Sequence, residues 1–390
     1  MEAPLVWAEI DVTAISHNVA ELRRITHPDA ELMIAVKANG YGHGAVETAR
    51  AALAGGATRL GVARVEEALE LRKAGIEAPI LICGYTPPAQ APQLAAQDLW
   101  ASVFSLEGAR RLSSALKKNQ RLVIHLKLDT GMGRLGLLPD PPRTDAIDGT
   151  RPRQRTVNEI VHIGRLHNLA LEGIWTHFAA SDAADKSYTQ IQLEHFKRLV
   201  GEVEEAGLTI PIHHAANSGA IIDLPQSHMD MVRAGITAYG LYPSDNVKKK
   251  RLDLKPALQL KARIVHLKRV PQGAKISYGC TWEAKHATNI ATIAVGYGDG
   301  FSRALSNRGA MLVGGKRAPI IGRVCMDLTM IDVGINTEAK VGDEVVIIGR
   351  QGDQMITTDE IAQKLNTINY EVVTNLMARV PRVFVNSLMR

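Results

Sequence analysis

The feature that most constrains the fold of this chain is a regular alternation of two kinds of segment from residue 13 to residue 240. Short apolar or β-branched runs take turns with longer stretches that have the period of an amphipathic helix. One such stretch is Tyr188–Ala206, in which apolar side chains recur every three or four residues. This alternation is typical of repeated strand–helix units built around a parallel sheet.

Eight strands are predicted from these runs, and eight strand–helix units in succession indicate a closed (β/α)8 barrel of the TIM type, an α/β fold. The predicted strands are Leu32–Lys37, Leu60–Ala63, Pro79–Cys83, Leu99–Phe104, Leu122–Leu128, Ala170–His177, Ile212–Ala215 and Met229–Ala234.

After Tyr242 the pattern changes to short strands separated by turns that contain Gly and Pro, which predicts a second, β-rich C-terminal domain. A chain of 390 residues also exceeds the usual size of one hydrophobic core. A capping-box pattern at Thr357–Glu360 predicts one helix in this part. The predicted strands are Ala257–Val270, Ile293–Val295, Met311–Val313, Ile320–Val324, Met330–Val333 and Glu344–Ile348.

These patterns predict three stretches of chain. We expect residues 1–12 to form a strand that joins the β domain, residues 13–243 to form the barrel, and residues 244–390 to form the β-rich domain.

The distribution of charge and of cysteines excludes several classes of function. The net charge of +6 is scattered, and the one tight basic run, Lys248–Arg251, follows a Pro-Ser-Asp turn, so we interpret it as a solvated linker rather than a nucleic-acid patch. The three cysteines lie far apart without a CxxC pair, which argues against a disulfide framework or a zinc site. No leader pattern and no run of eighteen apolar residues occurs. We therefore expect a cytoplasmic protein with no nucleic-acid or membrane partner.

A dense group of glycines and polar residues, Ala35–Gly44, follows the first predicted strand. Active sites of such barrels lie at the carboxyl ends of the strands. A lysine there, Lys37, can be desolvated enough to present a neutral amine, which Schiff-base formation with an aldehyde cofactor requires. The alternative is a lysine that merely snorkels at a strand end, and placement alone leaves both interpretations open.

The fifth predicted strand alternates strictly, so His125, Lys127 and Asp129 share one face. The loop that follows it places Arg134 at the same rim, where a guanidinium could bind a substrate carboxylate. A buried structural ion network would account for the same pattern.

The loops after strands seven and eight are the usual phosphate site of this barrel. Ser218 offers a hydroxyl there, and Gly219, Gly235 and Ile236 offer backbone N–H groups, which suffice for a phosphate monoester. Histidines 125, 177, 213 and 214 could suggest a metal site, but they form no chelating pair on one helix and few carboxylates accompany them. No metal is expected.

The segment Val36–Gly44 resembles the cofactor-lysine signature of the bacterial alanine racemase family. Further segments resemble the same family in the same order: Leu126–Gly136, Thr176–Ala179, Asn217–Ala220, Val232–Ile236, Ser277–Gly279, Val295–Gly300, Gly322–Asp327, Ile368–Glu371 and Arg379–Arg382. The resemblance covers essentially the whole chain. The segment Pro139–Asn158 departs from it, because it is longer than expected between the fifth strand and its helix.

The resemblance implies a pyridoxal 5'-phosphate enzyme that interconverts L-alanine and D-alanine and supplies D-alanine for peptidoglycan. It implies a homodimer whose active sites are shared between chains. Lys37 would be the Schiff-base lysine and one catalytic base. The cofactor would also contact Tyr41, His177, Ser218, Arg233, Gly235, Ile236 and Tyr370, of which Arg233 would face the pyridine nitrogen.

The substrate would contact Arg134, Met326 and Asp327. Lys127 resembles the family lysine that is often carbamylated and that orients Arg134. The resemblance makes Tyr278 of the partner chain the second base, although a tyrosine in a Ser-Tyr-Gly turn is ordinarily a surface or packing residue. Racemisation does need two bases, because the α-proton leaves one face and another returns to the opposite face.

Three rival functions share parts of this pattern. A cofactor-carrier protein would match the barrel alone, and a decarboxylase of the same two-domain plan would carry a different second-domain motif. A racemase of broader amino-acid range is the nearest rival.

Overall fold

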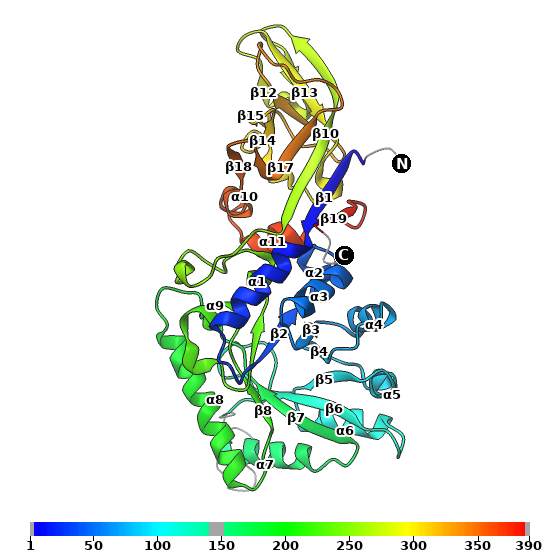
Figure 1. Ribbon diagram of the computed structural model, residues 1–390, viewed down its shortest axis with the longest axis vertical. Helices are drawn as coiled ribbons and strands as arrows, with labels where there is room; N and C mark the ends of the chain where they lie inside the picture. Colours follow the sequence, from blue (N-terminus) through cyan, green and yellow to red (C-terminus); the bar gives the residue numbers. More distant parts are fainter. Residues whose placement is uncertain (1–3, 140–151, 387–390) are drawn as a thin grey trace. The chain divides into compact units, whose positions relative to one another are not determined.

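A computed structural model describes residues 4–139 and 152–386 of the chain. It divides into two compact units (Figure 1). The barrel unit consists of Ala14–Gly40 and Ala45–Lys255. The second unit consists of the chain up to Thr13, the short segment Tyr41–Gly44, and the chain from Pro256 onward.

The barrel unit holds eight parallel strands in the order β8-β7-β6-β5-β4-β3-β2-β9, which confirms the predicted fold class. The strands are β2 Glu31–Ala35, β3 Arg59–Val62, β4 Ile80–Ile82, β5 Leu99–Val103, β6 Leu122–Lys127, β7 Leu169–Trp175, β8 Ile212–His214 and β9 Met231–Ala234. The barrel is nearly closed, since the N–H of Asp230 donates to the carbonyl of His213 at 3.1 Å and that of Arg233 to Ala216 at 2.9 Å. A cluster of buried side chains fills its interior: Met33, Leu81, Trp100, Ile212 and Met231.

Helices separate the strands along the chain: α1 Val12–Ile25, α3 Ala45–Ala54, α4 Val65–Lys73, α5 Ala91–Ala96, α6 Leu106–Ala115, α7 Pro152–Gly164, α8 Ser187–Glu205 and α9 Ser218–Asp223. The helix predicted over Tyr188–Ala206 is confirmed as α8, and Leu193, Phe196 and Val200 on its apolar face are buried. Of the long segment Pro139–Asn158, residues 140–151 lie outside the described residues, and residues 152–158 belong to α7.

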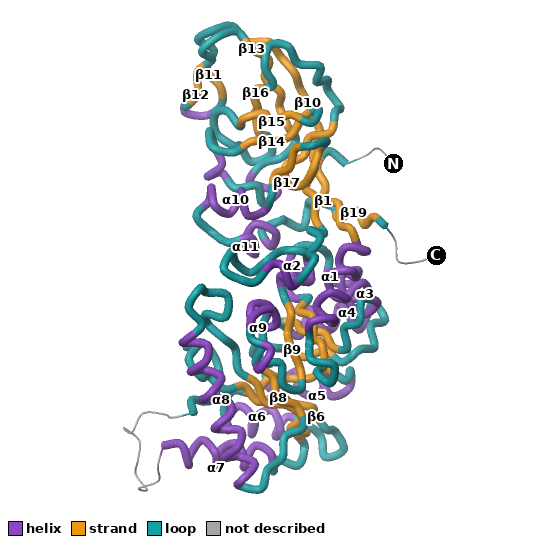
Figure 2. Tube along the Cα trace, turned by 60° about the vertical axis from the view of Figure 1, so that its left-hand side comes forward, coloured by secondary structure: helices purple, strands orange, loops and turns teal. Residues whose placement is uncertain are grey.

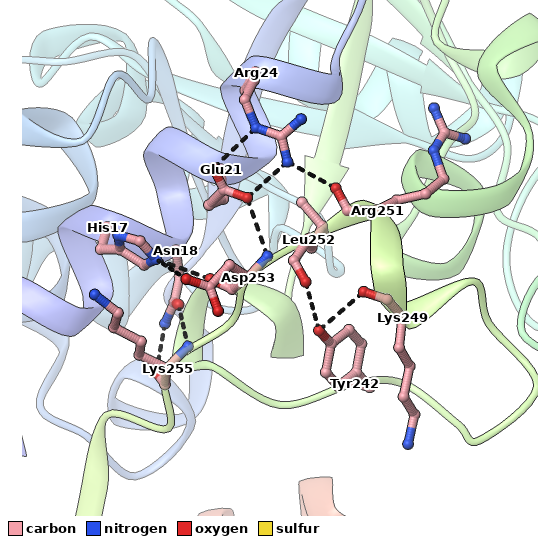
Figure 3. A network of polar contacts seen from close by, with 10 residues as sticks. All are labelled: His17, Asn18, Glu21, Arg24, Tyr242, Lys249, Arg251, Leu252, Asp253 and Lys255. Atoms are coloured by element: carbon pink, nitrogen blue, oxygen red, sulfur yellow. Dashed lines mark hydrogen bonds and ion pairs between the residues drawn. The ribbon is translucent and has the colours of Figure 1, made fainter.

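Polar contacts tie residues 251–255 to α1 (Figure 3). The side-chain amide of Asn18 donates to the carbonyl of Lys255 at 2.8 Å, and its oxygen accepts the N–H of Lys255 at 2.7 Å. Glu21 accepts the N–H of Asp253 at 3.0 Å. These bonds attach the end of the barrel unit, which extends to Lys255, to its first helix.

The second unit is built on a nine-stranded sheet (Figure 2). Strand β1, Val6–Asp11, pairs antiparallel with β10, Leu258–Val270, and parallel with β19, Arg382–Val385. The other strands of this sheet are β13 Thr288–Ile293, β14 Ala310–Val313, β15 Lys316–Pro319, β16 Thr329–Asp332, β17 Glu344–Gln351 and β18 Gln354–Ile356, and β11 Lys275–Ile276 pairs with β12 Trp282–Glu283.

Two helices belong to the second unit, α10 Thr358–Leu365 and α11 Asn369–Thr374. The predicted helix start is confirmed, since the hydroxyl of Thr357 accepts the N–H of Glu360 at 3.0 Å. Among the described residues, no helix has the length and apolar character needed to cross a bilayer.

Two strand predictions for the second unit are wrong. In the predicted strand Ile320–Val324, only Ile320 forms an isolated bridge, because Gly322 turns the chain with a φ of 67°. A Cβ on Gly322 would lie 2.6 Å from the carbonyl oxygen of Ile276, so this turn is packed against another strand. The strand predicted to begin at Ile293 ends there instead, and the N–H of Val295 folds back onto the carbonyl of Ile293.

Candidate active site

Lys37 follows β2 in the barrel unit and begins a left-handed turn. The next four residues all have positive φ: Ala38 52°, Asn39 54°, Gly40 59° and Tyr41 51°. For a residue with a side chain this conformation costs roughly 1–2 kcal/mol, so the turn needs external support. Its far end is held by two hydrogen bonds, from the N–H of Gly40 to the carbonyl of Val36 at 2.9 Å and from the N–H of Ala45 to the side chain of Asn39 at 3.0 Å.

The barrel brings the predicted phosphate residues together. Ser218 begins α9, which the side chain of Asn217 caps by accepting the N–H of Ala220 at 3.2 Å. The hydroxyl of Ser218 is buried and accepts the N–H of Gly235 at 2.9 Å. It also lies 3.0 Å from the hydroxyl of Thr237, which is in the short helical turn that Ile236 begins. Hydroxyls and backbone N–H groups thus converge at the carboxyl ends of β8 and β9.

Arg233, on β9, is buried against two histidines. Its guanidinium donates to Nδ1 of His214 at 2.9 Å and to the carbonyl of Thr176 at 2.7 Å, and it lies 3.5 Å from Nδ1 of His177. Burial lowers the pKa of Arg233 to about 10, so it remains a cation at neutral pH. Burial and the charge of Arg233 hold the pKa of both His177 and His214 well below the ordinary value. The histidines beside this cation are therefore neutral.

The polar chain continues inward to His125, whose Nδ1 lies 2.8 Å from Nε2 of His214. Because Nδ1 of His214 accepts from Arg233, Nε2 of His214 carries the proton and donates it to His125. Burial lowers the pKa of His125 to about 3, and Trp100 and Trp175 stack on the two imidazoles. His125 thus supports Arg233 through His214.

Lys127 is a second buried cation-forming group, 1% exposed, at the end of β6. Its Nζ lies 4.7 Å from the ring centroid of Trp175. Burial, followed by the positive charges of Arg134 and Arg233, lowers the pKa of Lys127 to about 8. The side chain therefore presents far more neutral amine near pH 7 than an exposed lysine does.

The loop that carries Arg134 is organised by one carboxylate. Burial of Asp129 would raise its pKa, but four backbone N–H donors outweigh that effect and lower the pKa below its ordinary value. The donors are those of Gly131, Met132, Gly133 and Arg134. Arg134 itself is exposed.

In the second unit, Tyr41 and Tyr370 lie side by side, with ring centroids 6.3 Å apart. The turn that carries Tyr41 packs closely on α11, because a Cβ on Gly42 would lie only 2.1 Å from the carbonyl oxygen of Val373. The second unit therefore places the two predicted tyrosines together.

Tyr278 occupies a strained turn elsewhere in the second unit. The preceding Ser277 has φ 65° and ψ −178°, a conformation that is essentially restricted to glycine. Its hydroxyl donates to the carbonyl of Arg323 at 2.7 Å and lies 3.5 Å from the sulfur of Cys325. The turn is thereby tied to the segment that carries Met326, and Tyr278 is 73% exposed in the single chain.

Met326 and Asp327 are held by Arg379. The guanidinium of Arg379 donates to buried Asp299 at 2.7 Å and to Asp327 at 2.8 Å. Met326 and Asp327, the predicted substrate residues of the second unit, therefore lie on one segment that Arg379 holds in place. Among the described residues, no group of three or more His, Cys, Asp or Glu side chains is arranged to hold a metal ion, and the three cysteines are free.

Sequence reasoning missed three residues that support these groups. His214 was considered only for a metal site, and Arg379 only as part of a family segment. Glu67, which accepts the N–H of Ala38 at 2.7 Å, was not considered. A capping-box pattern would have drawn attention to Glu67, but Arg64 stands where that pattern has Ser or Thr.

Known proteins match the chain over both units. Residues 10–243 match the family "Alanine racemase, N-terminal domain", and residues 257–384 match "Alanine racemase, C-terminal domain". An alanine racemase of Desulfosudis oleivorans is 50% identical over 381 residues, which cover 97% of this chain and 96% of that protein.

Solved structures agree with this match. An alanine racemase of Clostridium difficile 630 superposes with a TM-score of 0.91 at 37% identity, covering 99% of this chain and 97% of that one. A histidine racemase of Leuconostoc mesenteroides superposes with a TM-score of 0.88 at 29% identity, covering 99% of each chain. The resemblance found in the sequence is confirmed, and the chain belongs to the alanine racemase family.

Proposed function

We propose that this protein is a pyridoxal-phosphate-dependent alanine racemase that uses two bases, Lys37 and Tyr278, and supplies D-alanine for peptidoglycan. The observation that carries the proposal is the 50% identity with an alanine racemase over nearly the full length of both chains. The histidine racemase shares the fold at 29% identity, so the fold by itself leaves the substrate open.

The residues present fit pyridoxal phosphate. Lys37 offers its amine at a strand end, while Ser218, Gly235 and Ile236 offer a hydroxyl and backbone N–H groups suited to a phosphate monoester. Arg233, flanked by His177, offers a fixed cation for the pyridine nitrogen. When bound, the cofactor supplies an electron sink that makes the α-proton of an amino acid removable. We further assign Tyr41 and Tyr370 to the phosphate.

The chain's own residues then have distinct tasks. Nζ of Lys37 takes or returns the α-proton on one face of the substrate, and Oη of Tyr278 from the partner chain does so on the other. Arg134 binds the substrate carboxylate through two parallel N–H donors of its guanidinium, in a bidentate pair. Lys127, converted by carbon dioxide to a carbamate, would be an anion able to orient Arg134.

The substrate range follows from the walls of the site. We propose that Tyr278 and Met326 of the partner chain, together with Asp327, line the site and admit only a small side chain. We therefore expect alanine to be racemised efficiently, serine less so, and lysine or histidine poorly. Arg233, which is itself a cation, would disfavour a proton on the pyridine nitrogen of a bound cofactor, and this would restrict side reactions.

The purified protein, loaded with pyridoxal phosphate, tests the proposal. Each enantiomer of alanine, serine, lysine and histidine is incubated separately, and the opposite enantiomer is measured by chiral chromatography. Racemisation of alanine in both directions is expected, with the label from borohydride reduction on Lys37. Release of carbon dioxide without racemisation would identify a decarboxylase, cofactor binding without turnover would identify a carrier protein, and preferred histidine turnover would overturn the substrate assignment.

A further inference from the structure

Glu67, in the first turn of α4, binds backbone groups from two neighbouring strand ends. Its Oε2 accepts the N–H groups of Ala63 at 2.7 Å and Arg64 at 3.0 Å, which lie between β3 and α4. Its Oε1 accepts the N–H of Ala38 at 2.7 Å, which follows β2. One half-buried carboxylate thus satisfies three donors, and one of these donors lies directly after Lys37.

The bond to Ala38 fixes the backbone of Lys37. The N–H of Ala38 belongs to the planar peptide group that also contains the carbonyl of Lys37. Holding this N–H therefore fixes the orientation of that peptide plane, and with it the direction in which the Lys37 side chain leaves the strand. Of the two other bonds of the turn, that from Gly40 to the carbonyl of Val36 spans Lys37 without binding the peptide group that follows it, and that to Asn39 acts further along the turn.

The bond to Ala38 is separable from capping α4. Capping the helix needs only Oε2, which accepts the N–H groups of the two residues directly before α4. Oε1 reaches away from the helix to the neighbouring strand end. Ala38 has a φ of 52°, a conformation that is unfavourable for alanine. A strong acceptor at its N–H therefore stabilises a conformation that the local sequence does not favour.

We propose that Glu67 is a positioning residue for Lys37, holding the peptide plane that follows it so that Nζ is aimed at the cofactor. The proposal rests on the proposed function in one respect, the role of Lys37 as the cofactor lysine.

Glu67→Gln separates the two roles of the carboxylate. The amide has one oxygen, and this oxygen satisfies two donors if it faces Ala63 and Arg64 but only one if it faces Ala38. The NH2 group is then left against the N–H of Ala38, which breaks that bond and keeps the helix cap. Glu67→Asp retains the charge but is one methylene shorter, so it cannot span both strand ends. Glu66→Gln is the matched control, because Glu66 is exposed and its hydrogen bond within the described part of the chain is a long one, from the side-chain amide of Gln90 at 3.5 Å.

The first measurement uses the cofactor-free proteins and does not depend on activity. Amide hydrogen exchange at Ala38, followed by mass spectrometry of short peptides, should be at least about 10-fold faster in Glu67→Gln and Glu67→Asp than in wild type. Exchange in Glu66→Gln should equal that of wild type. Exchange at Ala38 that matches wild type in both Glu67 variants would overturn the inference, as would a Glu67→Asp variant that behaves as wild type while Glu67→Gln does not.

The second measurement uses the loaded proteins. The borohydride-trapped fraction at Lys37 and kcat for alanine should fall about 10-fold in both Glu67 variants, with KM within about twofold of wild type, because substrate contacts are retained. Equal values in Glu67→Gln and Glu66→Gln would overturn the inference. If wild type itself carries no label on Lys37, the proposed function fails instead, and the exchange data still decide whether Glu67 holds the turn. Should one Glu67 variant not fold, the other carries both measurements.

Discussion

The backbone N–H of Arg134 donates to Oδ2 of Asp129 at 2.8 Å, while Oδ1 of the same carboxylate accepts three N–H groups earlier in the loop. Glu67 acts in the same manner on the turn after Lys37. The two side chains proposed to hold the cofactor and the substrate thus both follow a strand end, and in both cases a carboxylate holds the backbone that carries them.

Asp129→Asn should therefore impair substrate binding more than cofactor binding. The amide retains one oxygen for the three N–H groups on the Oδ1 side and turns its NH2 group toward the N–H of Arg134. We expect a loss of about 2 kcal/mol in the free energy of unfolding and a fall of about 100-fold in kcat/KM for alanine. Urea denaturation and steady-state kinetics measure the two effects. Unchanged KM with intact cofactor binding would contradict the proposed role of Arg134.

Lys127 should take up carbon dioxide as a carbamate. A pKa of about 8 leaves about a tenth of its amine neutral at pH 7, against roughly one part in three thousand for an ordinary lysine. At a fixed concentration of dissolved 13CO2, the carbamate resonance in 13C NMR should grow as pH rises from 6 to 8, because deprotonation supplies the reacting amine. Lys127→Arg should lack that resonance. A spectrum shared by both proteins would place the carbamate elsewhere.

Glu21 should contribute to stability only above acid pH. Its hydrogen bonds from Arg24 and from the N–H of Asp253, opposed by partial burial, lower its pKa from 4.5 to about 2. A carboxyl with a lowered folded pKa stabilises the protein above pH 4.5, and this contribution is lost as pH falls from about 4.5 to 2. Because Glu21 is near the surface, we expect Glu21→Gln to cost about 1 kcal/mol at pH 7 and nothing near pH 2.

Denaturant midpoints at several pH values measure this difference. The control is Glu194→Gln, which alters an exposed carboxyl on α8 and should change stability little at any pH. A constant difference between Glu21→Gln and wild type across the acid range would show that the carboxylate does not hold the chain at Asp253.

The fold could be predicted from the sequence where the signals are local or periodic. Alternating strand and helix patterns indicated the barrel, and the Thr357 cap marked a helix start within one residue. The strand β15, Lys316–Pro319, could not be recognised, because it is a polar edge strand held by pairing with β14. The strand predicted at Ile320–Val324 is wrong because of another contact between distant parts of the chain. The turn at Gly322 depends on packing against Ile276.

Residue types were enough to propose a candidate site from the sequence, whereas the geometry of that site could not be predicted. The strand end made Lys37 a candidate and the family resemblance gave it a role, but propensities do not place Ala38 and Tyr41 in left-handed conformations. That turn depends on Glu67, which lies 29 residues from Ala38 in sequence. Likewise, the bonds that make His214 and His125 neutral supports of Arg233 join three strands, and no local pattern encodes them.

Tyr278→Phe should slow proton exchange on one enantiomer of alanine more than on the other. The two proposed bases act on opposite faces, so loss of the phenol leaves Lys37 able to exchange the proton on its own side. Incubation of each enantiomer in D2O, followed by mass spectrometry of recovered alanine, measures the two rates. We expect a fall of at least about 100-fold for one enantiomer and less than about 10-fold for the other. Equal losses would argue against separate roles.

Lys37 belongs to the barrel unit and Tyr278 to the second unit, and we propose that each active site combines the Lys37 of one chain with the Tyr278 of its partner. A two-fold axis makes this exchange reciprocal. Lys37→Ala and Tyr278→Ala homodimers should each be inactive. In a mixed dimer, one site has both residues and the other site has neither.

Co-refolding equal amounts of the two variants should therefore restore activity. If chains pair at random, about half of the dimers are mixed, and each mixed dimer has one complete site, so activity should approach about a quarter of wild type per total site. Differently tagged chains and tandem affinity purification isolate the mixed dimers, whose activity should be about half that of wild type. Inactive mixed dimers would mean that Lys37 and Tyr278 act within one chain, because both sites of such a dimer would then lack one base.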